Sequence, residues 1–585
     1  MHIRISRPLE TSAKPQGRGT FHGSSIVGEP GDWPAPREVL IATVLAALAV
    51  WIEIVFSRRL GLLAGLPLFD GVNYMGGAKR AYLVLATFAH APRAGLFSQL
   101  EAIWPLLHSP LWVGLMTINF FIFGPGEWQS YLVRIWPVSL FLLLVIWVVR
   151  RRSSAQVALY CGILTALLPM VSPALNAAAW GRAGIPAPQY AYLADLRPDF
   201  FSAVLVVWAL AILIEAGTRL RRSWSLASGA FLGLALLCKP TSTPGLMALW
   251  GLAAVWVLIL NFKVAWQTFK IGAWAVIPIC LLTALYVSVG GYTHIAGYLE
   301  ITLVKTVSTW TIPNPTLVNL LKYFWAGFNV AMGVEGWILF SLALVAVVLA
   351  CIRRNQPEKG LFVYLGLALL WYALVTRIPA KNIFFGITFY LLLWVFSLSA
   401  LASITEVAWS RFWMVLRILT VIFSAALVFK GFQSLREFSP ELSTLSVQNR
   451  ATIQKVASDL LAVLSAQDSY TSADWYGIIG GALPYYTITP QHGALFPVMW
   501  DPSDPPQAIP SFIEERVAKS KVIYVFKQDM AEVCQHDFVA KPVSYPYYRE
   551  LGKWVRRQQN GFALRTEYPI YFPGARVDIE MYVRR

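Results

Sequence analysis

Aspartate is scarce in the first 430 residues of this chain, and it stands where long apolar runs begin or end. Only four Asp occur there, and three of them, Asp70, Asp195 and Asp199, border such runs. A carboxylate at an apolar boundary is costly unless it is solvated, paired or used in chemistry, so these three are candidates for a functional site. Asp70 also has an ordinary explanation, because the dipeptide Asp70-Gly71 is a common turn former.

Basic residues near the same boundaries supply the second half of a candidate site. Guanidinium and ammonium groups suit phosphate oxygens, and at a hydrocarbon boundary the natural phosphate is a lipid headgroup. For any single residue, a side chain that snorkels to the interface is the better explanation, so the prediction rests on the whole set. The set consists of Lys79, Arg80, His108, Arg197, Lys239, Arg377 and Lys381.

His108 fits two compatible roles. It precedes Ser109 and Pro110, which suit the N-cap and the first position of a helix. A histidine there can also donate a hydrogen bond to a leaving phosphate, whether the ring is neutral or charged.

His492 and His536 have no neighbouring cluster of His, Asp or Glu, and no sequence motif encodes a metal site, so no metal ligands are assigned.

The composition indicates a membrane protein with several spans. Of the 585 residues, 57% are hydrophobic and only 14% are charged, whereas soluble proteins carry about 25% charged residues. Apolar runs of about 20 residues recur through residue 430, and each is long enough to cross a bilayer core of about 30 Å. This pattern excludes a disordered chain, a secreted disulfide scaffold and a protein with a single membrane anchor.

The positive charge belongs to the apolar part of the chain. Residues 1–430 carry 32 Lys and Arg against 15 Asp and Glu, whereas residues 431–585 carry 16 of each kind. Basic residues that flank spans set the orientation of the spans and bind anionic headgroups. No basic helix or base-stacking motif is present, so nucleic acid is excluded as a partner.

The five Cys form neither a CxxC pair nor a plausible disulfide framework.

Three regions follow from this pattern. Residues 1–37 are expected to be a disordered cytoplasmic tail, residues 38–430 a transmembrane module, and residues 431–585 an extracytoplasmic α/β domain, because helix-like and strand-like runs alternate there. The first run has no small-residue cleavage site and is expected to be a retained span. About eleven spans are predicted, at 38–57, 129–149, 155–175, 199–217, 225–238, 241–262, 271–290, 335–352, 361–377, 383–404 and 412–430.

The distribution of basic loops predicts the orientation. The short loops on one side, of which Arg150 to Arg152 and Lys263 to Lys270 are examples, are net positive, and this side is therefore cytoplasmic. The long polar segments 58–128, 176–198 and 291–334 fall on the other side. Residues 109–124 are also apolar, but a full span there would invert everything downstream, so they are expected to form an interfacial or re-entrant helix.

The order of several motifs resembles a known family. An acidic motif after the first span, PLFDGVNYMGGAKRAY, is followed by HSPLW, FGPGEWQSYLVRIWPVSL, LRPDFF and GAFLGLALLCKPT, with a fainter RIPAKNIFFGITFYLLL further on. This sequence resembles the GT-C glycosyltransferases, in particular the branch with bacterial lipid A aminoarabinose transferases and protein O-mannosyltransferases. The similarity covers roughly residues 39–262 and rests on the motif order.

The resemblance implies a transferase that moves a sugar from a polyprenyl-phosphate carrier to an acceptor hydroxyl of a lipid, glycan or protein. The reaction would take place, with inversion, at the outer face of a bacterial inner membrane. Asp70 falls at the position of the family's catalytic base, and Asp199 would orient the catalytic groups or the acceptor. Lys239 would face the donor phosphate. Tyr74 is assigned to the substrate site.

The sequence departs from the family at two motifs. The family commonly has an acidic pair after the first span, whereas Gly71 follows Asp70 here. A single carboxylate makes metal dependence less expected. No cofactor is assigned, and a divalent metal has no visible motif. The second departure is His108-Ser109-Pro110, where the family has a Lys-Pro-Pro-like motif.

Three other functions compete with a sugar transferase. A transporter or lipid flippase would need ionisable groups midway along spans, and Glu53 is the clear acidic candidate. A ligase that moves a whole oligosaccharide from a pyrophosphate carrier would share the same outer site. A scaffold that only presents residues 431–585 would make a substitution of Asp70 harmless.

Overall fold

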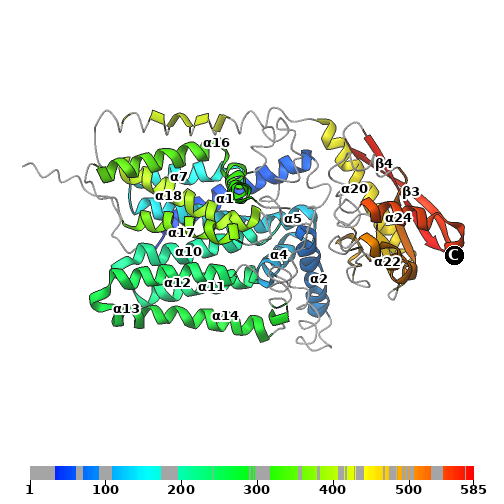
Figure 1. Cartoon of the computed structure of the whole chain (residues 1–585), viewed down its shortest axis with the longest axis horizontal. Coiled ribbons are helices and arrows are strands. Elements are labelled where there is room, and N and C mark those ends of the chain that lie inside the picture. The colour runs from blue at the N-terminus through cyan, green and yellow to red at the C-terminus, as the bar shows by residue number, and fades with distance from the viewer. Residues whose placement is uncertain are drawn as a thin grey trace, which may run out of the picture.

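A computed structural model describes most of the chain. The described ranges are 33–60, 70–90, 109–172, 196–240, 243–288, 316–352, 359–377, 383–405, 440–465, 468–472, 485–489, 506–528, 545–572 and 575–585, with a few isolated residues between them. The molecule consists of a long helical bundle with an α/β domain at one end of it (Figure 1). About half of the predicted span 412–430 is described, as separated helical residues, and the rest of it lies outside the described residues.

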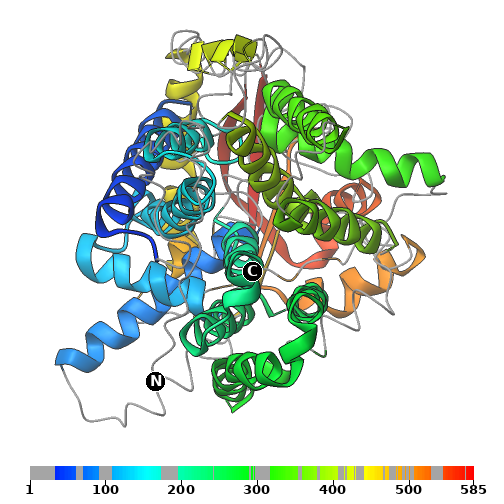
Figure 2. The ribbon, with the colours of Figure 1, turned by 90° about the vertical axis from the view of Figure 1, so that its left-hand side faces the viewer.

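The helices of the bundle follow the apolar runs of the sequence. Six stretches among the described residues are long and apolar enough to cross a membrane: Pro36–Val55, Glu127–Arg150, Asp199–Ala216, Phe262–Ser288, Ala331–Ile352 and Lys359–Thr376. Five shorter apolar helices accompany them, at Pro110–Phe123, Ala155–Ala166, Arg222–Cys238, Gly245–Leu260 and Ile387–Ser403. In Figure 2, which looks at the bundle from its end opposite the α/β domain, most of these helices are seen nearly end-on.

The elements of the bundle have the following bounds. They are α1 (Pro36–Leu60), α2 (Asp70–His90), α4 (Pro110–Phe123), α5 (Glu127–Tyr131), η2 (Leu132–Arg134), α6 (Ile135–Arg150), α7 (Ala155–Ala166), α10 (Asp199–Ala216), α11 (Arg222–Cys238), α12 (Thr243–Leu260), α13 (Ala265–Gly272), η8 (Ala273–Ala275), α14 (Val276–Ser288), α16 (Leu317–Ile352), α17 (Lys359–Arg377) and α18 (Ile387–Thr405).

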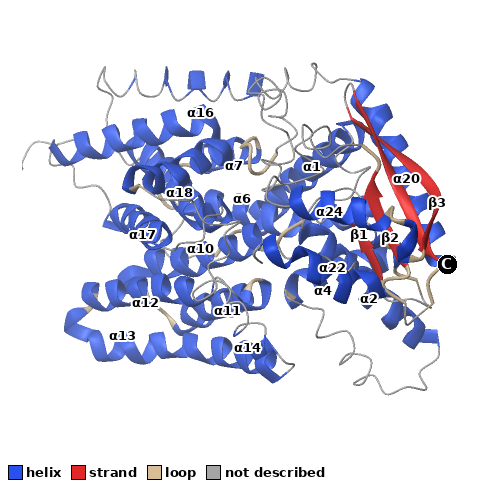
Figure 3. Cartoon of the chain, turned by 45° about the vertical axis from the view of Figure 1, so that its right-hand side comes forward, coloured by secondary structure: helices blue, strands red, loops and turns tan. Residues whose placement is uncertain are grey.

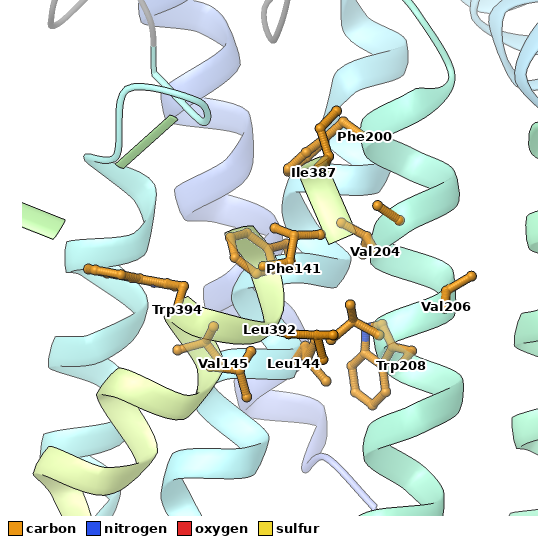
Figure 4. Packing of buried hydrophobic residues seen from close by; sticks show 14 of the residues in the cluster. Phe141, Leu144, Val145, Phe200, Val204, Val206, Trp208, Ile387, Leu392 and Trp394 are labelled. Carbon is orange, nitrogen blue, oxygen red and sulfur yellow. The ribbon is translucent and has the colours of Figure 1, made fainter. Parts of the chain in front are cut away.

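Helices α6, α10 and α18 form the centre of the bundle. Phe141 of α6 and Phe200 of α10 meet edge to face, with ring centroids 5.9 Å apart, and both lie near Ile387 of α18 (Figure 4). Trp208 donates its indole N–H to the carbonyl oxygen of Leu140 at 2.8 Å, and Trp394 donates to the hydroxyl of Thr165 at 2.9 Å. The large aromatic side chains thus fill the space between helices, while the indole N–H groups of Trp208 and Trp394 each have a partner.

Charged residues mark the bundle end away from the α/β domain. Arg151 and Arg152 lie 3.3 and 2.7 Å from the two carboxylate oxygens of Glu215, near the end of α10, and Arg150 lies 2.8 Å from Glu38 at the start of α1. These contacts bring the ends of α6 and α10 together, so the two helices run in the same direction. Asp199, the first residue of α10, therefore lies at the opposite end.

The α/β domain is built on one four-stranded sheet. Strands β1 (Tyr470–Ser472) and β2 (Val522–Phe526) pair in parallel, and β2 and β3 (Phe562–Phe572) each pair antiparallel with β4 (Ala575–Arg584), which gives the order β1-β2-β4-β3. Helix α20 (Pro440–Leu461) contacts β3, and α24 (Tyr545–Val555) contacts β2 and α22 (Ile509–Glu515). Figure 3 shows the sheet in red with these helices around it.

Several helix boundaries differ from those expected from hydropathy. The segment Lys263 to Lys270, expected as a loop, is helical through α13 and continues into α14, and α16 begins at Leu317, inside the segment 291–334 expected as a loop. At the first place α12 ends at Leu260 and a short 3-10 turn (Phe262–Val264) leads into α13, whereas in α16 polar side chains interrupt the apolar run without ending the helix. Helix α16 bends instead at Gly333, whose φ of 72° suits glycine. Helix α7 stops at Ala166, before Pro169.

The segment 58–128, expected as an outer loop, contains the two helices α2 and α4. Helix α4 has 14 residues, which is short for a span, and it packs against α2 and α11. A helix is thus confirmed where the sequence predicts an interfacial one, and the apolar Pro110–Phe123 owes its burial to its helix neighbours.

A glycine substitution tests the tight contact between α11 and η8. A Cβ atom on Gly229 would overlap the carbonyl oxygen of Ala275, whereas a Cβ on Gly251 of α12 would meet open space. We expect Gly229→Ala to lower the free energy of unfolding by about 1–3 kcal/mol through overpacking. The matched Gly251→Ala should leave it unchanged or raise it slightly, because alanine favours a helix. Thermal unfolding of the detergent-solubilised variants measures both, and equal midpoints would contradict this packing.

Candidate functional site

An ion pair between Asp199 and Lys239 occupies the bundle end that faces the α/β domain. Lys239 Nζ contacts Asp199 Oδ1, and the two side chains are 15% and 8% exposed. Asp199 is the first residue of α10, and Lys239 directly follows the last residue of α11. The antiparallel packing of these two helices brings together two residues that are 40 positions apart in sequence.

The local backbone favours both charges where they stand. A helix N-terminus stabilises a carboxylate and a helix C-terminus stabilises a cation, so Asp199 and Lys239 each match the helix dipole beside them. Two further bonds hold these helix ends in place: Ser202 donates to the carbonyl oxygen of Ala235 at 3.3 Å, and the Cys238 thiol donates to that of Pro198 at 3.4 Å. The pair is therefore fixed by the α10–α11 packing.

The segment before α10 is tied to α4. Trp112 of α4 donates its indole N–H to the carbonyl oxygen of Leu196 at 2.7 Å, and its ring lies 5.8 Å from that of Phe201. Arg197, one of the predicted phosphate-binding residues, is only 9% exposed and lies two positions before Asp199. The structure thus brings Arg197, Asp199 and Lys239 to one end of α10 and α11.

Helix α2 joins this region through α4. Asp70, the predicted base, is the first residue of α2, and its side chain lies outside the described part of the structure. Thr117 of α4 donates to the carbonyl oxygen of Ala78 in α2 at 3.4 Å, and Tyr74 is half-buried against the main core. Helix α4 therefore contacts both the helix that begins with Asp70 and the segment that precedes Asp199.

Lys79 of α2 contacts the α/β domain. Its ammonium group donates to the carbonyl oxygen of Tyr485 at 3.0 Å and sits 4.5 Å from the centroid of the Tyr485 ring. Burial lowers the pKa of Lys79 to about 8, and the charge of Glu127 opposes this shift. Among the described residues, the contacts of Lys79 are thus with the domain junction, while its predicted role at a phosphate stays a prediction.

The carboxylate of Glu127 is the centre of this junction. The Tyr486 hydroxyl donates to Glu127 Oε1, and Arg450 Nε lies 3.1 Å from the same oxygen. The Tyr485 hydroxyl donates to the carbonyl oxygen of Pro125 at 3.2 Å. Sequence reasoning missed Glu127, because its partners are more than 300 residues away along the chain; its position in the motif FGPGEWQSY is the one signal that could have pointed to it.

The other predicted site residues are not brought into this arrangement by the described structure. Asp195, His108 and Lys381 lie outside the described residues, and Arg377 is the last residue of α17 with its side chain also outside them. Among the described residues, no group of three or more His, Cys, Asp and Glu has the arrangement of a metal site.

Glu53, the residue on which a transporter interpretation depends, has a cationic partner. It lies 3.8 Å from Arg134 of η2, and the two side chains are 3% and 5% exposed. Arg134 also donates to the carbonyl oxygen of Val171 at 3.4 Å. An acidic residue that carries ions along a pathway has to exchange partners, whereas this pair is enclosed by α1, η2 and the segment after α7.

The fold is shared with ArnT from Cupriavidus metallidurans. The apo crystal structure of that protein aligns with a TM-score of 0.54 at 12% sequence identity, covering 93% of this chain and 97% of that chain. Its structure bound to undecaprenyl phosphate aligns with a TM-score of 0.53 at 14% identity, covering 92% and 97%. The fold expected from the motif order is therefore confirmed: this chain shares with these structures a polytopic helical bundle and a C-terminal α/β domain.

A further structure aligns more weakly. The oligosaccharyltransferase of Archaeoglobus fulgidus, in complex with Zn and sulfate, has a TM-score of 0.43 at 13% identity, covering 82% of this chain and 67% of that chain. No protein-family model and no curated protein matches the sequence.

A double-mutant cycle separates the structural role of the ion pair from any role in binding. Asp199→Asn or Lys239→Met alone leaves one charge buried without its partner, and we expect each to lower the free energy of unfolding by about 3–5 kcal/mol. The double variant removes both charges and should recover most of that loss. Thermal unfolding of the three variants measures the coupling, and additive losses would show that the two residues do not stabilise each other.

The buried ammonium group of Lys79 predicts a pH dependence at the domain junction. Its pKa is lower in the folded chain, about 8, than its ordinary value of 10.5. Between these values the unfolded chain binds more protons than the folded chain, so stability should rise with pH from 8 to 10.5. Lys79→Met keeps the length of the side chain and should remove this contribution. Unfolding midpoints measured across that pH window test it; parallel curves for both proteins would refute the assignment.

Proposed function

We propose that this chain is a membrane glycosyltransferase that moves a sugar from a polyprenyl-phosphate carrier to an acceptor hydroxyl. The observation that carries the proposal is the ArnT fold over 93% of the chain, combined with the Asp199–Lys239 pair at the bundle end that faces the α/β domain. One structure with this fold is described as bound to undecaprenyl phosphate, a donor carrier of the proposed class.

The donor has to lie with its isoprenoid tail in the bilayer and its phosphate at the interface. Spans that end at the same level meet this need, because the tail packs beside apolar helices while the phosphate reaches the charged residues at their ends. Lys239 and Arg197 are cations at such an end. They would bind the donor phosphate and stabilise the negative charge that develops on it as the sugar leaves.

Asp70 would act as the general base. Its carboxylate takes the proton of the acceptor hydroxyl while the hydroxyl oxygen attacks the anomeric carbon, and the bond between that carbon and the phosphate oxygen breaks on the opposite side. This single displacement inverts the configuration of the sugar. Asp199 holds Lys239 in position until the donor phosphate arrives, and it thereby acts as a positioning residue.

The remaining residues of the proposed donor site are Tyr74, Lys79, His108, Arg377 and Lys381. Polar groups at this end of the bundle would take up the phosphate and the sugar hydroxyls, and no metal is assigned to the reaction. The acceptor, whether lipid, glycan or protein, would approach from the side of the α/β domain. The protein would act in a bacterial inner membrane, with its N-terminus in the cytoplasm and the α/β domain outside.

Substitution of Asp70 tests the mechanism. Asp70→Asn keeps the shape of the side chain but cannot accept a proton, so transfer should fall by at least about 100-fold, within the range that general bases contribute, while binding of undecaprenyl phosphate is unchanged. Mass spectrometry of envelope glycans and lipid-linked sugars, in a deletion strain that carries either variant, gives the readout. Loss of one sugar with accumulation of its lipid-linked donor is the expected result.

The control for this experiment is the double variant Asp199→Asn/Lys239→Met. It is expected to fold, because both charges are absent, but to bind undecaprenyl phosphate more weakly than wild type because Lys239 is gone. If Asp70→Asn restores every glycan that the wild type restores, the catalytic assignment is wrong and a transporter or scaffold becomes the better function. Accumulation of a complete pyrophosphate-linked oligosaccharide would favour the ligase.

A further inference from the structure

Two kinds of basic residue stand at the bundle end away from the α/β domain. The arginines Arg150 to Arg152 are largely buried and paired with the carboxylates of Glu38 and Glu215. Four other cations at this end, Arg221, Arg222, Lys263 and Lys270, are exposed, and none of them has a carboxylate partner within the described ranges. Their charge faces outward and is left uncompensated by this part of the protein.

Aromatic side chains lie among these unpaired cations. Trp266 and Phe269 of α13 are 66% and 53% exposed, and their rings stack with centroids 5.7 Å apart. Lys270 Nζ lies 5.1 Å from the centroid of the Trp266 ring, and the Arg222 guanidinium lies 5.3 Å from that of Trp274. Lys270 and Arg222 therefore each lie beside a tryptophan ring, and the rings of Trp266 and Phe269 remain exposed.

Helix packing makes these residues one surface. The start of α11, which carries Arg222, packs against α13 and η8, and Gly229 allows α11 to approach the carbonyl oxygen of Ala275 closely. Asn261, just after α12, donates to the carbonyl oxygen of Gly217 at 3.2 Å and fixes the turn that leads into α13. The surface is thus held by α10, α11 and α12, and Figure 1 shows α13 at the far left of the bundle.

The composition of this surface is typical of a membrane–water interface. Tryptophan is enriched where a membrane meets water, and unpaired Lys and Arg beside it attract anionic headgroups. A helix of this kind lies along the interface with its aromatic face among the acyl chains. Helix α13 lies at the junction of α12 and α14, and the continuous stretch Phe262–Ser288 is apolar enough to enter a membrane at that point.

We propose that Arg221, Arg222, Lys263 and Lys270, with the aromatic rings of α13, form a binding site for the headgroup of an anionic phospholipid. Phosphate oxygens of the lipid accept hydrogen bonds from the guanidinium and ammonium groups, and Trp266 and Phe269 contact the acyl chains next to the headgroup. A zwitterionic lipid brings its own cation and competes poorly. This site is separate from the Asp199–Lys239 end, so it does not rest on the proposed transferase activity.

The test compares lipid binding by two variants with four substitutions each. In the first, Arg221, Arg222, Lys263 and Lys270 are all changed to Gln. The control matches the number and exposure of these cations: Arg516, Lys519, Arg549 and Lys553 of the α/β domain are changed to Gln, of which Arg549 and Lys553 lie 3.6 and 3.4 Å from Glu550. Arg516 also lies over an aromatic ring, that of Phe512, at 5.9 Å. Native mass spectrometry of the full chain then counts bound cardiolipin, phosphatidylglycerol and phosphatidylcholine.

Wild type and the control should bind cardiolipin with equal affinity and prefer it to phosphatidylcholine. The first variant should lose more than about tenfold in cardiolipin affinity, because it removes four cations and each of them attracts the anionic headgroup. A third variant, Trp266→Ala/Phe269→Ala, keeps every charge and should also bind cardiolipin more weakly than wild type does. Unchanged cardiolipin binding by the first variant, an equal loss in the control, or equal binding of phosphatidylcholine by wild type would overturn the proposal.

Discussion

The structure depends on one constraint: a charge at the edge of an apolar bundle has to be paired or to reach water. The described charges inside the bundle follow it. Glu53 pairs with Arg134, Glu215 with Arg151 and Arg152, and Asp199 with Lys239. An isolated charge in this environment costs several kcal/mol, so each pair favours the helix packing that brings its two members together. The order of the helices in the bundle is thus tied to its ion pairs.

The same constraint gives the two ends of the bundle different characters. At one end the arginines at and after the end of α6 pair with Glu38 and Glu215, and the exposed cations around α13 have no carboxylate partner among the described residues. At the other end, the Asp199–Lys239 pair stands at the ends of two apolar helices, and both side chains are largely buried. The proposed headgroup site lies at the first end, and the proposed donor site, where a phosphate would displace Asp199 from Lys239, lies at the second.

The junction at Glu127 links the α/β domain to the helices that carry the proposed site. Arg450 and Tyr486 of that domain bind one carboxylate oxygen, and Tyr485 contacts both Lys79 of α2 and the turn before α5. Burial raises the pKa of the Tyr486 hydroxyl, as does the adjacent charge of Glu127, so this hydroxyl stays protonated and donates its hydrogen bond. The α/β domain is therefore attached to the helix that begins with Asp70.

The sequence by itself determined the fold class, because apolar runs of span length and a charge-balanced tail have few other solutions, and the order of its motifs pointed to the GT-C fold. Hydropathy misplaced the limits of α13 and α16, since polar residues such as Lys270 in α13 and Asn329 in α16 weaken an apolar run without breaking the helix that contains them. Which charges pair was decided by the tertiary structure alone: Asp199 and Lys239 are 40 residues apart, and Glu127 and Tyr486 are 359 apart. Pairing depends on helix packing and domain docking, which no local pattern of residues encodes.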